Sequence, residues 1–390
     1  MESSQSSPSF SYPDPFYADT QGHKFCFMPD GVHRFDALLE MIQEAKQSLH
    51  MFYYMFQDDL AGNPVRDALV AAAGRGVEIS LIVDRFGSDA SEEFFQPLID
   101  AGARFCFFNA KVSRRYLVRN HQKMTIADRH TALLGGFNIS EHYFNPPAEN
   151  GWCDIGVKVE GPLVDDLLDW FALLEDWAQN DRAQLRAVRQ MVAHWEPGDG
   201  PVRLLVGGPT RSPNNWSRTV KRDLAKGSRL DLIMAYFSPP RAFRRHIRRL
   251  ARRGHARLVM AAKSDNSATV AAARATYRAL LHAGADIYEF QPCKLHMKLL
   301  VIDDAVYFGS ANFDHRSIRL NLELMVRVED SALADRVREF INKLSEASLP
   351  ISPELHRGRH GFFRRIAGWI GWFLVTTVDY TVSRRLNIGG

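Results

Sequence analysis

Cysteine is scarce in this chain of 390 residues. The four cysteines, Cys26, Cys106, Cys153 and Cys293, are scattered, and no two of them form a Cys-x-x-Cys pair. Zinc fingers and small disulfide scaffolds both need grouped cysteines, so this spacing disfavours both classes. The low cysteine usage fits a protein of a reducing compartment.

A long apolar stretch is also missing. The longest run covers residues 366–378, which is thirteen residues, whereas a helix that crosses a bilayer needs about 20. The polar N-terminus lacks the basic and then apolar order of a signal peptide. We therefore expect neither a spanning helix nor a leader, and we assign residues 1–22 to a flexible tail.

Net charge is small as well. Lys and Arg number 49 and Asp and Glu number 45, which leaves +4. The excess lies in residues 355–390, where six arginines accompany one acid. A general nucleic-acid coat is more strongly basic, so we expect no nucleic-acid partner. The apolar share of 46% and the charged share of 24% are typical of a globular protein.

Two halves of the chain repeat one order of strand-like and helix-like segments. In the first half we expect strands over residues 50–56, 77–83 and 105–108. In the second half we expect strands over residues 230–237, 258–262 and 287–290, and helices over residues 243–253 and 270–281. Such alternation predicts an α/β fold.

A Pro- and Gly-rich linker over residues 196–201 marks the boundary between the two halves of the chain. The linker follows a helix that we expect to begin at Pro162. We therefore predict four parts. They are the tail (1–22), a first lobe (23–195), a second lobe (196–350) and a basic, aromatic C-terminal segment (351–390).

A His-x-Lys-x4-Asp pattern occurs once in each half, with an offset of 175 residues. The chain has only eleven lysines, so one chance match is expected on the order of a few hundredths of the time, and two in register far less often. The two sets are His121, Lys123 and Asp128, and His296, Lys298 and Asp303. Each is followed by a turn of small residues and an asparagine, Gly135-Gly136-Phe137-Asn138 and Gly309-Ser310-Ala311-Asn312.

The spacing within each motif suits a phosphate site. Residues i and i+2 of a strand share a face, so each half presents an imidazole together with an ammonium group. Asp128 and Asp303 have the opposite parity, and we expect them to support the site rather than attack. Glycine lets the backbone approach a ligand closely, and asparagine amides donate to anionic oxygens. We therefore list as phosphate-binding candidates Gly136, Asn138, Ser310 and Asn312.

One irregularity separates the two turns. Six residues lie between Asp128 and Gly135, but five lie between Asp303 and Gly309. A difference of one residue shifts the local pleat. The direction in which Ser310 points is therefore left open.

Two half-sites around one phosphate suit a two-step displacement. One histidine attacks phosphorus and forms a phosphohistidine, and the other protonates the leaving alcohol and then activates the incoming one. Imidazole titrates near neutrality, and the lysines and asparagines would stabilise the charge of the transition state. No carboxylate cluster with metal-ligand spacing accompanies the motifs, so we expect neither a metal nor another cofactor.

The doubled motif resembles the phospholipase D superfamily, and the surrounding sequence is similar to its bacterial cardiolipin synthase branch. The segments that carry this similarity are residues 135–144, 152–162 and 309–326. The resemblance implies two sheet-and-helix lobes related by a pseudo-twofold axis, with the active site at their seam. It also implies that a downstream acid, Asp154 or Glu323, orients each histidine and that His121 is the nucleophile.

The motifs indicate phosphodiester chemistry and leave the acceptor open. The resemblance and the charge distribution favour a phosphatidyltransferase that converts two phosphatidylglycerols to cardiolipin and glycerol, with phosphatidylethanolamine as an alternative second lipid. Three alternatives stay open: a phospholipase D hydrolase that makes phosphatidic acid, a nuclease of the same superfamily, and a silent lipid-binding scaffold. We expect a peripheral protein on the cytoplasmic side of the cell membrane.

Arginine-rich stretches favour the same location. Residues 362–385 combine crowded aromatics with flanking arginines, which is typical of contact with an anionic membrane surface. A helix that closes the core or contacts a second subunit is the alternative, and the oligomeric state stays open. Six arginines with helical spacing in residues 244–253 indicate a solvated face or a face toward anionic lipid. Residues 114–119 would line the mouth of the site.

Overall fold

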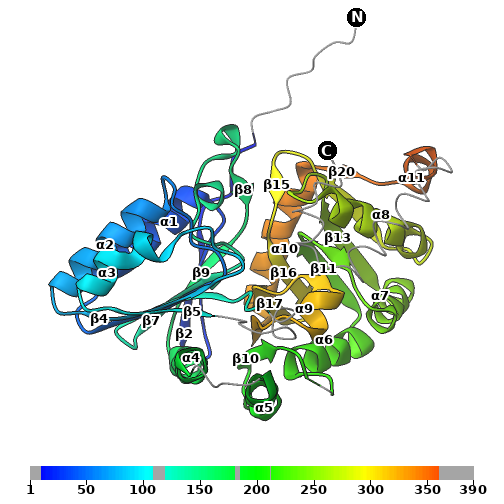
Figure 1. The fold of residues 1–390 in the computed structure, drawn as a ribbon. Coiled ribbons are helices and arrows are strands. Elements are labelled where there is room, and N and C mark those ends of the chain that lie inside the picture. The colour runs from blue at the N-terminus through cyan, green and yellow to red at the C-terminus, as the bar shows by residue number, and fades with distance from the viewer. Residues whose placement is uncertain (1–9, 109–118, 181–184, 211, 360–390) are drawn as a thin grey trace, which may run out of the picture.

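Two eight-stranded sheets, one from each half of the chain, face each other in the computed structural model (Figure 1). The structure describes residues 10–108, 119–180, 185–210 and 212–359. Within these ranges no helix is long and apolar enough to cross a membrane.

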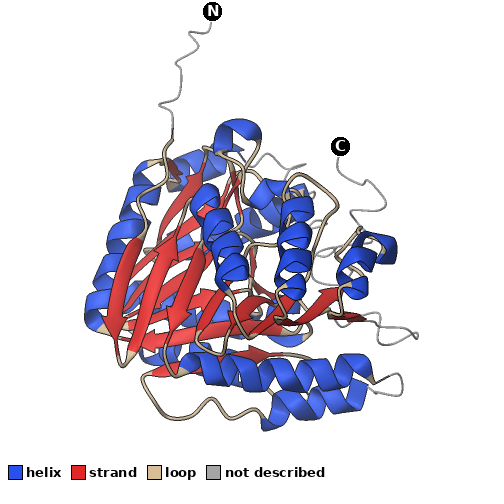
Figure 2. Cartoon of the chain, turned by 90° about the vertical axis from the view of Figure 1, so that its left-hand side faces the viewer, coloured by secondary structure: helices blue, strands red, loops and turns tan. Residues whose placement is uncertain are grey.

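The first lobe carries its helices between strands, as the sequence predicted. Its elements are β1 (Phe16–Thr20), β2 (His23–Met28), α1 (Gly31–Glu44), β3 (Ser48–Tyr53), α2 (Gly62–Gly74), β4 (Glu78–Asp84), α3 (Glu92–Asp100), β5 (Arg104–Phe108), β6 (Lys123–Ala127), β7 (Thr131–Gly135), β8 (Trp152–Cys153), β9 (Gly156–Glu160), α4 (Leu163–Gln179) and α5 (Leu185–His194). The helices α4 and α5 lie side by side along one edge of the molecule (Figure 2).

The second lobe repeats this order. Its elements are β10 (Val202–Gly207), α6 (Asn215–Lys226), β11 (Arg229–Met234), β12 (Phe237–Ser238), α7 (Arg241–Arg253), β13 (His255–Ala261), α8 (Ser267–Leu281), β14 (Asp286–Phe290), β15 (Lys294–Leu295), β16 (Lys298–Ile302), β17 (Ala305–Gly309), β18 (Phe313–Asp314), α9 (His315–Arg319), β19 (Glu323–Glu329), α10 (Ser331–Glu346), β20 (Ser348–Pro350) and α11 (Pro353–Arg359).

The two sheets share one topology. The order β2-β9-β7-β6-β3-β4-β5 in the first matches β10-β19-β17-β16-β11-β13-β14 in the second. Corresponding neighbours also run in the same sense, with a parallel β3-β4-β5 set and a parallel β11-β13-β14 set. The duplicated α/β fold with two lobes is therefore confirmed.

Hydrophobic burial explains this layering. The strands β6 and β16 are buried at every position, because helices or the other lobe cover both faces of each sheet. The apolar faces of α1, α2 and α3 pack on the outer face of the first sheet, and those of α6, α7 and α8 pack on the second. The inner faces form one core with α4 and α10, in which Phe308 lies 5.3 Å from Phe27 between ring centroids.

Part of the segment that the sequence assigned to a flexible tail forms regular structure. Residues Phe16–Thr20 form the edge strand β1, which pairs antiparallel with β2. Further upstream, the ring of Phe10 packs against Phe290 of the second lobe at 5.2 Å. The half-buried rings of Phe10, Tyr12 and Phe16 pack against the core and explain this order. The polar residues around them hid this signal from the sequence analysis. The predicted membrane-contact segment 362–385 lies outside the described residues.

Candidate active site

The two motif histidines lie just before β6 and β16, at the seam between the lobes. The backbone N–H of His121 donates to the carbonyl of Leu322 at 2.9 Å, and that of His296 donates to the carbonyl of Cys153 at 2.7 Å. Each acceptor belongs to the other lobe, and the short pairing of β8 with β15 makes the same crossing. The backbone thus fixes each histidine to the opposite half of the molecule.

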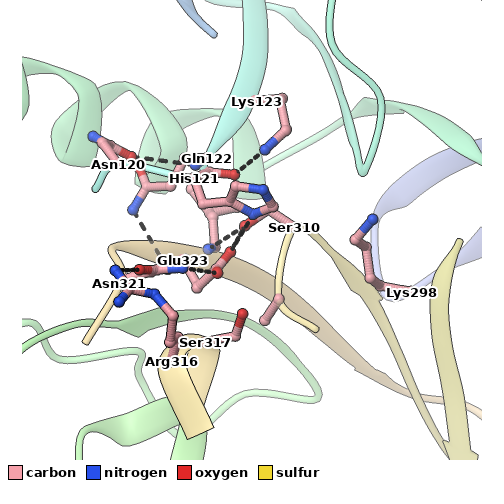
Figure 3. A network of polar contacts seen from close by, with 12 residues as sticks. Asn120, His121, Gln122, Lys123, Lys298, Ser310, Arg316, Ser317, Asn321 and Glu323 are labelled. Atoms are coloured by element: carbon pink, nitrogen blue, oxygen red, sulfur yellow. Dashed lines mark hydrogen bonds and ion pairs between the residues drawn. The ribbon is translucent and has the colours of Figure 1, made fainter. Parts of the chain in front are cut away.

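Each histidine is also paired with a carboxylate of the opposite lobe. Nδ1 of His296 lies 2.7 Å from Oδ2 of Asp154, and Nδ1 of His121 lies 3.3 Å from Oε2 of Glu323 (Figure 3). An ionised carboxylate only accepts hydrogen bonds, so Nδ1 is the protonated nitrogen of each ring and Nε2 keeps its lone pair. The sequence analysis named both acids but did not foresee that the pairs cross between the lobes.

Both acids are fully buried. Burial alone would raise the pKa of each carboxyl, but the adjacent cations and hydrogen bonds outweigh it. The nearby Lys298 lowers the pKa of Asp154 below its ordinary value. The nearby His121 lowers the pKa of Glu323 below its ordinary value. The acids therefore stay ionised at neutral pH and keep the histidine rings oriented.

The imidazoles themselves are neutral at neutral pH in the substrate-free enzyme. Burial and the nearby Lys298 lower the pKa of His296 to about 4. Burial and Lys123 lower the pKa of His121 below its ordinary value. A neutral imidazole whose Nε2 is unprotonated can act as a nucleophile or as a general base.

The lysines lie on the same side of the strands as the histidines, as their spacing predicted. Nζ of Lys123 donates to the carbonyl of His121. Nζ of Lys298 donates to the carbonyl of His296 and lies 2.8 Å from Nδ1 and 3.1 Å from Nε2 of the same ring. Burial lowers the pKa of Lys298 to about 8 and the pKa of Lys123 well below its ordinary value. A bound anion would favour the charged form of both amines.

The turns of small residues after β7 and β17 contact the carboxylates of Asp154 and Glu323. Oγ of Ser310 donates to Oε2 of Glu323 at 2.6 Å and accepts from the backbone N–H of Leu324 at 3.0 Å. The corresponding residue of the first lobe is Gly136, where an added Cβ would lie 2.7 Å from Oδ1 of Asp154. The direction of Ser310, which the spacing left open, is thus toward the carboxylate (Figure 3).

The two asparagines are not equivalent. Oδ1 of Asn138 accepts from the backbone N–H of Met55 at 3.1 Å, and its Nδ2 donates to the hydroxyl of Tyr143 at 2.9 Å. This amide therefore braces its turn. The buried Oδ1 of Asn312 has no hydrogen-bond partner within the described part of the chain, and Asn312 lines the cavity next to His121.

The motif aspartates lie at the far ends of their strands from the histidines. The carboxylate of Asp128 accepts from the backbone N–H groups of residues 46–48 at 2.7 to 2.9 Å. The carboxylate of Asp303 accepts from those of residues 228 and 229 at 3.0 and 2.9 Å. Both aspartates have positive φ angles, 51° and 47°. They tie the turns after β6 and β16 to the chain that enters β3 and β11, which is a supporting role.

A cavity of about 60 Å³ opens beside His121. The ring of Tyr54 lies 4.9 Å from the imidazole of His121, and Tyr236 lies 6.3 Å from that of His296. The sequence analysis missed both tyrosines, although their offset of 182 residues equals the offset between the Ala-Gly-Ala segments at residues 101–103 and 283–285. Other residues in the wall are Arg119, Asp314, Arg316 and Asn321. Residues 114–118, predicted to line the mouth, lie outside the described residues.

A buried arginine that the sequence analysis missed holds the first lobe's acid in place. Arg34 of α1 is 0% exposed. Its guanidinium donates to the carbonyls of Pro29 at 2.5 Å, Asp154 at 2.8 Å and Tyr143 at 2.6 Å. No local pattern marks this residue, because Tyr143 and Asp154 are more than 100 positions away in sequence and become its neighbours only in the fold.

Comparison with known proteins gives the family. The family model described as "Cardiolipin synthase, PLD-like domain" matches residues 38–173 and 221–345. Cardiolipin synthase 2 of Bacillus cereus is 31% identical over 359 residues, with 87% of this chain and 67% of the relative covered. Cardiolipin synthase B of Escherichia coli K12 is 27% identical over 336 residues, with 84% of this chain and 81% of the relative covered.

The fold matches a solved structure as well. The crystal structure of phosphatidylserine synthase from Haemophilus influenzae superposes with a TM-score of 0.72 over 94% of this chain and 97% of that protein, at 14% identity. This likeness supports the duplicated two-lobe fold. The sequence matches confirm the predicted resemblance and the cardiolipin synthase-type assignment. The chain belongs to the PLD-like cardiolipin synthase family of the phospholipase D superfamily.

Proposed function

We propose that this enzyme transfers a phosphatidyl group from one phosphatidylglycerol to a hydroxyl of a second, which yields cardiolipin and glycerol. The main support is the pair of neutral histidines, each with Nδ1 held by a carboxylate of the other lobe. Two such imidazoles supply a nucleophile and a proton donor to one phosphate. The names of the relatives point to the same phospholipid chemistry.

In the first step, Nε2 of His121 attacks phosphorus. The His121 side chain is 15% exposed against 6% for His296, and His121 lines the cavity. A bond forms between Nε2 and phosphorus while the bond from phosphorus to the head-group glycerol oxygen breaks. His296 gives a proton to that oxygen, and glycerol leaves.

His296 must carry a second proton in that step, although its pKa is about 4 in the substrate-free enzyme. An opposite charge within about 4 to 6 Å favours the charged form of an imidazole. A phosphodiester anion bound between Lys123 and Lys298 would therefore raise the pKa of His296. Substrate binding itself would thus favour the protonated form of His296, which is the general acid.

In the second step, a hydroxyl of the second phosphatidylglycerol gives its proton to His296. Its oxygen forms a bond with phosphorus, the bond between phosphorus and Nε2 of His121 breaks, and cardiolipin leaves. Lys123, Lys298 and Asn312 would hold the phosphate oxygens through both steps, because developing negative charge is stabilised by fixed donors. Gly136, Asn138 and Ser310 would act by holding the acids and the turns.

We further propose that the enzyme works as a peripheral protein on the cytoplasmic side of the cell membrane, with residues 362–385 at an anionic lipid surface. The aromatic and arginine content of this segment supports the proposal. Deletion of residues 362–390 should weaken binding to phosphatidylglycerol vesicles much more than turnover of a soluble phosphodiester. Equal vesicle binding by the truncated protein would contradict this location.

The test of the reaction is product analysis by mass spectrometry. The purified enzyme is incubated with phosphatidylglycerol vesicles, with and without phosphatidylethanolamine, beside His121→Ala and a control, His33→Ala, at an exposed position. Cardiolipin that depends on His121 and not on His33 supports the proposal, and the added lipid shows which pair is used. Phosphatidic acid alone would instead indicate a hydrolase, and nucleic-acid cleavage without a lipid product would indicate a nuclease.

A further inference from the structure

A strongly cationic face covers part of the second lobe's outer layer. Helix α7 contains seven arginines and no acid, and α6 contains four basic residues and one acid. The two helices pack against each other on the outer face of the second sheet (Figure 1). A cluster of this many positive charges does not contribute to packing of the core, and it attracts a partner of negative charge.

The duplicated fold supplies an internal comparison. The counterparts of α6 and α7 in the first lobe are α1 and α2, which precede and follow β3 as α6 and α7 precede and follow β11. Together α1 and α2 contain four acids and only two arginines, one of which is the buried Arg34. The same architecture is therefore built without a cationic face, so the arginines of α7 are not a requirement of the fold.

The arrangement of the arginines within α7 works against helix stability. Its apolar side chains face the core, and exposed arginines follow one another along the other side at positions 241, 245, 249 and 252. None of these four has an ion pair among the described residues. Like charges at i and i+4, as at positions 241, 245 and 249, destabilise a helix. Arg241 and Arg245 near the N-terminus also oppose the helix dipole, whereas Arg252 in the last turn is compatible with it. A function other than folding must retain them.

The cationic face borders the active site. The strands β10, β11, β13 and β14 end at the edge of the sheet where the histidines lie, so α6 and α7 begin at that edge. A hollow of about 180 Å³ lies between the first turns of these helices and α9, with Lys221 and Arg319 in its wall. Two other residues of α9, Arg316 and Ser317, line the cavity beside His121.

We propose that the cationic face of α6 and α7 docks the second lobe on an anionic phospholipid bilayer and thereby sets the active-site edge against the lipid head groups. The choice of a lipid partner rests on the proposed phosphatidyl transfer. A cationic face on one lobe suits a planar anionic surface, whereas nucleic acid bound along the seam would need basic residues on both lobes.

The test measures vesicle binding without turnover, so its result does not depend on the reaction being correctly assigned. The full chain and its variants are sedimented with vesicles of phosphatidylcholine alone or mixed with phosphatidylglycerol. The test variant combines Arg245→Glu, Arg249→Glu and Arg252→Glu. The control combines Arg104→Glu, Arg129→Glu and Lys343→Glu, which changes the net charge equally at exposed positions elsewhere. Thermal unfolding confirms that each variant is folded, and a triple Gln variant of the same arginines replaces the Glu variant if that one does not fold.

The expected result is a loss of affinity for the mixed vesicles of about 100-fold or more in the test variant, with the control close to the unmodified protein. Turnover of detergent-dispersed phosphatidylglycerol should be unchanged in both. Equal binding by the test variant, or an equal loss in the control, would overturn the proposal. Tight binding of duplex DNA with no binding of mixed vesicles would overturn it in favour of a nucleic-acid surface.

Discussion

The imidazole Nδ1 of His296 lies 2.7 Å from Oδ2 of Asp154, a carboxylate that the other lobe supplies. The second histidine is paired in the same crossed sense, with Glu323. Neither lobe therefore contains a complete half of the active site, even though each contains a complete copy of the motif. Activity depends on the interface between the lobes as well as on the motif residues.

The crossed pair predicts the effect of Asp154→Asn. An amide can donate to Nδ1 and so favour the wrong tautomer, which would place the proton on Nε2. We expect kcat to fall about 10²- to 10⁴-fold, with an unchanged fold by circular dichroism. The control is Asp165→Asn at an exposed acid of α4. Near-normal kcat in Asp154→Asn would show that the carboxylate does not set the tautomer.

The assignment of the nucleophile is tested by trapping the covalent intermediate. A phosphodiester with a nitrophenol leaving group needs no proton donor for the first step. His296→Ala should therefore still accumulate phosphohistidine, whereas His121→Ala should not. The readout is the acid-labile, base-stable label on the protein, with peptide mapping to locate it. Label on His296 in the His121→Ala variant would reverse the two roles.

The buried lysines predict the alkaline side of the pH profile. Lys298 has a pKa of about 8, so its charged form is present below that pH and is lost as the pH rises through it. We expect kcat/KM, which reports the free enzyme, to fall above about pH 8 because the phosphate then loses a cationic partner. In Lys298→Arg this alkaline fall should become smaller, since guanidinium stays charged, and the part that remains would come from Lys123, whose pKa is also lowered. An unchanged alkaline limb in that variant would exclude Lys298 as its source.

The motif aspartates should matter for stability rather than for chemistry. Each carboxylate accepts at least two backbone hydrogen bonds in a turn remote from the histidines. We expect Asp128→Ala and Asp303→Ala each to lower the free energy of unfolding by about 1 to 3 kcal/mol. Denaturant unfolding measures this, and kcat of the folded protein should change only a few-fold. A loss of kcat as large as that of Asp154→Asn, without destabilisation, would contradict the supporting role.

The asymmetric turns predict unequal effects of exchanging their residues. In Gly136→Ser the added atoms would collide with the Asp154 carboxylate, which lies 2.7 Å from the position of a Cβ. Displacing that acid should lower kcat by about 10²-fold. Ser310→Gly removes one hydrogen bond to Glu323 and should cost about 10-fold. If Ser310→Gly were the more damaging exchange, the serine would have a role beyond holding the acid.

Patterns among residues close together in the sequence were sufficient to predict much of the fold and the motif residues. Strand and helix order, the duplication and the His-x-Lys-x4-Asp sets all depend on residues close together in the chain, where period and parity decide which side chains share a face. The i and i+2 spacing correctly placed His121 with Lys123 and left Asp128 outside the reacting centre. The early strand β1 was missed because five residues with alternating exposure give a weak signal.

Only the tertiary structure decided how the two halves complete each other. The contact of His296 with Asp154 joins residues 142 positions apart, and that of His121 with Glu323 joins residues 202 positions apart. The buried Arg34 and the different partners of Asn138 and Asn312 likewise depend on distant segments. Such contacts arise when two sheets pack their inner faces into one core, and that packing sets the distances between lobes, which no local periodicity encodes.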